Sequence, residues 1–108
     1  MDAVLDRSEW PRSLAEFTQR NAGRTSHLEV DDPSLGAQPA EDGMTFRGAT
    51  YDLRNDRLEI MLGDQGAGAA HLTHSVEHPD GLAVAEPDPR HAVLRIAHGT
   101  GQTLLTVG

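Results

Sequence analysis

The sequence predicts a mainly β domain of the α+β class: one N-terminal helix packed on a curled antiparallel sheet or small open barrel of about six to eight short strands. Two observations support this prediction. Apolar residues recur at helical spacing only near the N-terminus, whereas beyond Gly23 they alternate with polar residues, as in strands with one buried face. The connections between the alternating segments are too short for parallel crossovers, so we expect antiparallel neighbours.

The predicted helix covers residues 8–23. Its large apolar residues are spaced so that they line one face and pack on the sheet. These residues are Trp10, Leu14 and Phe17.

The ends of this helix carry recognisable signals. Ser8 is a candidate N-cap, with Pro11 tolerated in the first turn. Alternatively, Ser13 and Glu16 form a capping box, which would start the helix one turn later. Gly23 suits the left-handed position that ends a helix.

The strands are predicted from the alternation of apolar and polar residues and from the turn residues between the alternating segments. The clearest hairpin joins residues 50–52 to residues 58–62, with an asparagine and an aspartate in its turn. Gly48 marks a possible bulge, and Pro39 restricts residues 37–41 to an edge strand or a loop. The other predicted strands cover residues 25–30, 82–86, 92–98 and 103–107, with loops expected at 63–70 and 87–89.

A chain of 108 residues fits one domain, here 1–108, with residues 1–7 expected to be disordered, 8–23 helical and 24–108 a β-meander. The net charge of −8, with no lysine, argues against binding to nucleic acid or to anionic lipid. Cysteine is absent, which excludes disulfides and thiolate metal sites. Without a signal peptide or a long apolar stretch, the expected location is the cytoplasm.

Several short motifs resemble those of a known group of proteins. They include Trp10-Pro11, Tyr51-Asp52, Asp56-Arg57-Leu58 and the segment His71-Leu72-Thr73-His74. On these residues the chain resembles an uncharacterised bacterial family of short acidic proteins, a domain of unknown function. The resemblance covers residues 10–107 and implies a single full-length domain, but it brings no activity, cofactor or partner.

The segment from His71 to His78 is the one place where the sequence suggests chemistry. In a helix, His71, His74 and His78 would share one face and form a plausible zinc site. In a strand, His71 and His74 point to opposite faces. Alternation and β-branched residues favour the strand, with His74 on the apolar face as a core histidine, or else as a metal ligand or catalytic base assisted by Glu77.

Three functions remain open from the sequence. The first is a small non-enzymatic binding or interaction module with a protein partner or a small ligand, and an exposed edge at residues 37–41 would allow it to form a homodimer. The second is a histidine-centred metal-binding protein or small enzyme that uses His71, His74 and His78, with zinc as its metal; otherwise we expect no cofactor. The third is a pH-sensing surface, which six histidines on an acidic chain would allow.

Overall fold

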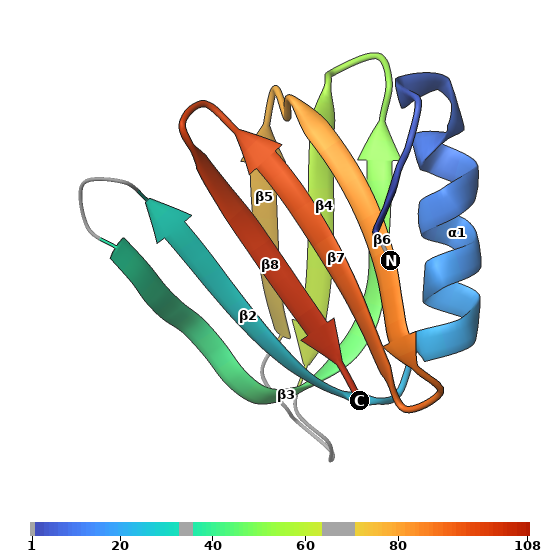
Figure 1. The fold of residues 1–108 in the computed structure, drawn as a ribbon, viewed down its shortest axis with the longest axis vertical. Helices are drawn as coiled ribbons and strands as arrows, with labels where there is room; N and C mark the ends of the chain where they lie inside the picture. The colour runs from blue at the N-terminus through green and yellow to red at the C-terminus, as the bar shows by residue number, and fades with distance from the viewer. Residues whose placement is uncertain (1, 33–35, 64–70) are drawn as a thin grey trace.

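The computed structural model describes residues 2–32, 36–63 and 71–108. Strands and one helix account for most of this part of the chain (Figure 1). In chain order the elements are β1 (Asp2–Val4), the 3₁₀ turn η1 (Arg7–Glu9), α1 (Trp10–Asn21), β2 (Thr25–Asp32), β3 (Gly36–Asp52), β4 (Arg57–Gly63), β5 (His71–Glu77), β6 (Gly81–Asp88), β7 (His91–His98) and β8 (Gly101–Val107).

The strands form one sheet in the order β1-β6-β7-β8-β2-β3-β4-β5, and all neighbours are antiparallel. This confirms the predicted fold class, with α1 packed on the sheet. The sheet is not closed, because β1 and β5 stand at opposite ends of the order, and it is not strongly curled either. The predicted meander is divided into two runs, β2–β5 and β6–β8, which the pairing of β8 with β2 joins.

The helix forms where its apolar spacing placed it, but its N-terminus differs from the prediction. A 3₁₀ turn precedes α1, and Asp6 caps that turn by accepting a hydrogen bond from the Ser8 backbone N–H. Ser8 is therefore not the cap, and Ser13 lies inside α1. Gly23 follows the helix with φ of +93°, the left-handed conformation expected at that position.

Residues 1–7 were expected to be disordered, and the structure corrects this for residues 2–7. Strand β1 pairs with β6, and the Leu5 N–H donates to the Leu82 carbonyl at 3.0 Å. The indole N–H of Trp10 also donates to the Leu5 carbonyl at 3.1 Å. An acidic, weakly apolar segment is thus held by backbone pairing, which composition does not reveal.

Within the sheet, the predicted 50–52 and 58–62 hairpin is confirmed as the end of β3 and the start of β4. The predicted bulge appears as a register shift between Phe46 and Gly48. Residues 37–41 are part of the long strand β3 and pair with β2, where Pro39 lies opposite Glu29. Most of the predicted loop at 63–70 lies outside the described residues.

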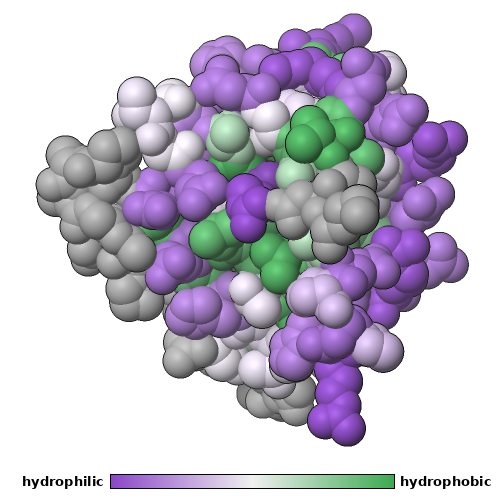
Figure 2. All heavy atoms as spheres, in the orientation of Figure 1, coloured by the Kyte–Doolittle hydropathy of each residue, from purple (hydrophilic) through white to green (hydrophobic). Residues whose placement is uncertain are grey.

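One apolar core joins the helix to both runs of the sheet. Phe17 of α1 and Phe46 of β3 meet edge to face, with their ring centres 5.5 Å apart. Leucines and isoleucines from β2, β4, β6, β7 and β8 complete the core. On the face shown in Figure 2, apolar residues lie in small patches among hydrophilic ones. No helix in the described part of the chain is long and apolar enough to cross a membrane.

Candidate functional site at the edge of the sheet

The histidine segment is strand β5, as alternation favoured, and this spreads its three histidines apart. His71 is exposed on the outer face, whereas His74 is half-buried on the inner face. His78 follows the strand and is exposed. The structure therefore does not assemble the three histidines into one ligand set, and within residues 2–32, 36–63 and 71–108 no group of three or more histidine, aspartate or glutamate side chains could hold a metal ion.

His74 instead meets a different histidine across a hollow of about 190 Å³. From β5 the hollow is lined by His74 and the three residues after it, and the opposite wall comes from Val30, His98 and Thr103. Because consecutive residues of β5 from both faces touch the hollow, it runs along the free edge of the strand. The other wall belongs to β2, β7 and β8.

The electrostatics of this hollow favour a neutral His74. Burial lowers the pKa of His74 below its ordinary value, and the neighbouring His98 lowers it further. His98 is fixed by a 2.9 Å hydrogen bond between its Nε2 and the Thr103 hydroxyl. A neutral imidazole carries one donor and one acceptor, so His74 can hydrogen-bond a polar group brought into the hollow.

The free edge of β5 is regular and uncovered by any other described strand. Its seven residues pair with β4 in an unbroken register, from Arg57 opposite Glu77 to Gly63 opposite His71. Strand β5 contains no proline, lysine or bulge, and these features commonly protect an edge strand from pairing with another chain. The strand at the other end of the sheet, β1, has only three residues.

The fold covers another free edge, that of the second half of β3. The Thr18 hydroxyl of α1 accepts from the Ala49 N–H at 3.0 Å and lies 3.3 Å from the Ala49 carbonyl as donor. After the helix, the Gly23 N–H donates to the Phe46 carbonyl at 2.8 Å, and the Phe46 N–H donates to the Arg24 carbonyl at 2.8 Å. The helix thus satisfies backbone groups that no strand pairs, which is the protection that β5 lacks.

A second polar cluster lies where β5 ends. Arg7 donates to the Asp56 carboxylate at 2.6 Å and to the Pro79 carbonyl at 2.8 Å, and its guanidinium stacks 4.5 Å from the Trp10 ring centre. The Tyr51 hydroxyl also donates to Asp56. His78 Nδ1 lies 3.2 Å from the other Asp56 oxygen.

This cluster fixes the turn before β4 and the turn after β5, which lie together at one end of the β4–β5 pair. Asp56 and His78 both adopt φ of +50°, a left-handed conformation that aspartate and histidine tolerate better than most residues. The Tyr51 hydrogen bond, followed by His78 and Arg7, lowers the pKa of Asp56. Burial raises the pKa of Tyr51 above its ordinary value. The guanidinium, hydroxyl and imidazole of this cluster all converge on the one Asp56 carboxylate, and no buried side-chain polar atom in the described part of the chain lacks a hydrogen bond, so we assign the cluster a structural role.

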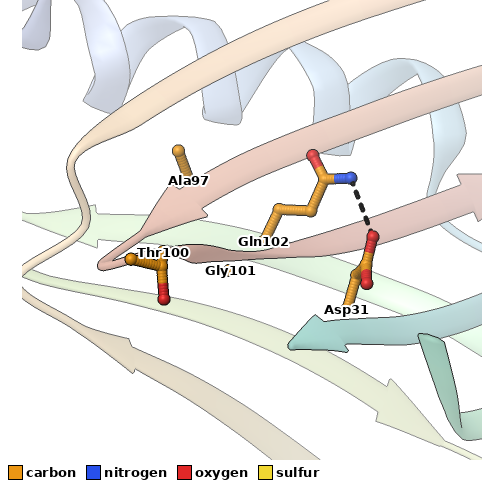
Figure 3. Close-up of a pocket in the computed structure, with 5 residues that line it drawn as sticks. All are labelled: Asp31, Ala97, Thr100, Gly101 and Gln102. Carbon is orange, nitrogen blue, oxygen red and sulfur yellow. Dashed lines mark hydrogen bonds between the residues drawn. The ribbon is translucent and has the colours of Figure 1, made fainter. Parts of the chain in front are cut away.

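Other hollows lie elsewhere on the molecule, including one beside β7 and β8 and one between α1 and β3. The first, of about 370 Å³, lies beside the β7–β8 turn, where the Gln102 amide reaches the Asp31 carboxylate at 3.4 Å (Figure 3). Its walls are mainly small or polar. The second, of about 460 Å³, is a more apolar groove between α1 and β3, floored by Gly48 and Ala49.

A comparison with models of protein families shows to which family this chain belongs. The model of one family matches residues 1–107, nearly the whole chain. The chain belongs to DUF5335, a family of unknown function. Neither the comparison with curated proteins nor that with solved structures gave a match. Membership of DUF5335 confirms the resemblance drawn from the sequence, and it adds no activity to transfer.

Sequence reasoning found part of the site and missed the rest. It placed His74 on the inner face of a strand, but it did not identify His98 as its neighbour, since the two lie on strands far apart in the sequence. It also missed Arg7, which fell in a segment expected to be disordered. The only available signal for the turn cluster was the presence of Tyr51 and Asp56 among the shared motifs.

Proposed function

We propose that this domain is a non-enzymatic binding module that accepts an extended protein segment as an added strand beside β5. The observation that carries the proposal is the uncovered, regular edge of β5 with a hollow alongside it. In strand addition, backbone hydrogen bonds supply affinity and neighbouring side-chain pockets supply specificity.

Two features of β5 support this mode of binding. Its inner face offers Leu72, His74 and Val76 to alternate side chains of an incoming segment, and its outer face is polar. The half-buried His74 lies at the middle of the strand, where it can form a hydrogen bond with one polar side chain of the bound segment. A net charge of −8 favours segments that are neutral or basic.

The test is a selection of displayed random peptides on the immobilised domain, followed by mapping of the selected peptides by amide chemical shifts in NMR spectra. We expect the largest shifts in β5, with protection of its amides from hydrogen exchange on binding. Peptides that map to the groove between α1 and β3 would contradict the proposal.

A matched pair of substitutions sharpens the test. Ser75→Lys places a solvated charge on the exposed face of the edge strand and should weaken binding, because lysine discourages pairing at an edge. Thr50→Lys makes the same change in charge at an exposed position that lines the α1 groove, and it should leave binding unchanged. The reverse pattern would assign binding to the groove.

The alternative function, a histidine-centred metalloprotein or small enzyme, now depends on His74 with His98 and no longer on His71 and His78. Elemental analysis of the purified domain tests it, with thermal melting before and after zinc is restored to chelated protein. Stoichiometric metal that is lost in His74→Ala would favour this alternative over the binding module.

A further inference from the structure

We propose that the strand accepted by β5 is β5 of a second copy of this chain, paired antiparallel about a two-fold axis at His74. This inference rests on the proposed function, since it names the partner of the same edge. It follows from the order of residues along the strand, which reads as a self-complementary sequence.

The pairs formed in this register are matched at every position. A two-fold axis at His74 places His71 opposite Glu77, Leu72 opposite Val76 and Thr73 opposite Ser75 of the second copy. On the outer face the pairs are therefore a base with an acid and two hydroxyls. On the inner face they are two apolar residues, with the two His74 side chains at the centre. Opposite charges, hydroxyl pairs and apolar pairs are the cross-strand combinations that stabilise antiparallel sheets.

Registers centred on the residues next to His74 give less well matched pairs. An antiparallel pair related by a two-fold axis normal to the sheet must be centred on a residue, so that inner faces meet inner faces. A centre at Thr73 places Leu72 opposite His74, and a centre at Ser75 places Val76 opposite His74. Both also shorten the pairing within β5. The register centred on His74 uses all seven residues of the strand.

The charges around the strand permit this pairing. Glu77 already lies 2.6 Å from Arg57 Nε through one carboxylate oxygen, and its second oxygen remains for His71 of the other copy. The pKa of His74 is lowered by burial and by His98, so the two central imidazoles meet in their neutral form near neutral pH. Each copy carries −8, so association is best measured at physiological salt, where repulsion between distant charges is screened.

The first experiment measures association by sedimentation from low micromolar to near-millimolar concentration. We expect the native chain to dimerise. His71→Glu places two glutamates opposite each other, and Glu77→Arg places arginine opposite His71, so each should weaken self-association about tenfold or more. An equimolar mixture of the two variants forms Glu–Arg and His–Glu pairs and should recover dimers. Failure of the mixture to recover them would overturn the charge pairing.

The register is tested by single cysteines, because the native chain has none. In this register residue 74 faces itself at a Cα separation of about 4.5 to 5.5 Å, within reach of a disulfide. His74→Cys should therefore form a covalent dimer on mild oxidation. Thr73→Cys alone should not, whereas Thr73→Cys mixed with Ser75→Cys should. Efficient self-linking of Thr73→Cys would overturn the register.

Failure of this inference is distinguishable from failure of the proposed function. A chain that stays monomeric to near-millimolar concentration overturns self-pairing, while selected peptides that map to β5 would still support strand addition. Peptides that map elsewhere, together with a dimer that persists in every β5 variant, would overturn both.

Discussion

At the scale of single residues, the half-buried His74 links the site to the stability of the domain. Its inner-face position leaves less water around the ring, and His98 opposes a second positive charge nearby. Both effects disfavour the charged imidazole in the folded state. The unfolded chain therefore binds a proton at His74 more readily than the folded chain does.

This difference predicts a dependence of stability on pH. Because folding lowers the pKa of His74, its contribution is fully present above the unfolded value of about 6.5 and is lost progressively as the pH falls below it. The free energy of unfolding, measured with urea at several pH values, should decrease with acidification. His74→Gln should show a shallower decrease than the native chain. Equal slopes in the two proteins would contradict this account of His74.

Asp56 gives a second prediction at the same scale. Its pKa is lowered first by the Tyr51 hydroxyl and then by His78 and Arg7. Tyr51→Phe removes the first of these donors and keeps the ring that packs edge to face on Trp10. The pKa of Asp56, followed by NMR of its carboxyl carbon, should rise toward its ordinary value. An unchanged pKa would mean that Arg7 and His78 alone hold the carboxylate.

At the scale of elements, α1 serves as cover for the unpaired part of β3. Thr18 contacts both the N–H and the carbonyl of Ala49, at the point where a bulge interrupts β3. A Cβ added at Gly48 would lie 3.3 Å from the Thr18 methyl, so glycine permits this close approach of helix and strand. One hydroxyl and one glycine therefore set the position of the helix.

Replacement of Thr18 tests this role. Thr18→Val keeps the shape of the side chain but leaves the Ala49 N–H without its acceptor, which should destabilise the domain by about 1 to 3 kcal/mol. Thr18→Ser keeps the hydroxyl and should cost less. Urea unfolding of the two variants and the native chain measures the difference. A valine variant as stable as the serine variant would show that the hydroxyl is dispensable.

Elements also show how far sequence reasoning reached. The helix, the hairpin of β3 and β4 and the bulge near Gly48 were predictable because local spacing and turn residues specify them. The pairing of β8 with β2 was not predictable, because these strands are far apart in the chain. The alternation of apolar and polar residues identifies a strand but does not specify which other strand it pairs with. For the same reason, the sequence did not predict that His74 and His98 are neighbours. Pro39 argued for an edge or a loop, and residues 37–41 pair with β2 on one side and with no described strand on the other, so they are an edge stretch of β3.

At the scale of the whole molecule, the two runs of the sheet share one core with the helix. Trp10 in α1 packs against Tyr51 of β3, while Ile96 of β7 is fully buried in the same apolar cluster. Only three residues, His78 to Asp80, connect β5 to β6, so the two runs cannot separate at that end. Shared burial and a short connection favour unfolding as one unit.

The single tryptophan makes this cooperativity measurable. Ile96→Val, in the run that contains β7, should lower the free energy of unfolding by about 0.5 to 1.5 kcal/mol. Trp10 fluorescence reports on the contact of α1 with β3, and far-ultraviolet circular dichroism reports on the helical and strand backbone together. The unfolding transitions followed by the two signals should shift by the same amount. If the fluorescence transition stayed in place while the dichroism moved, the helix and the β6–β8 run would be separate folding units. Strand addition at β5 would then act on a sheet whose two runs unfold independently.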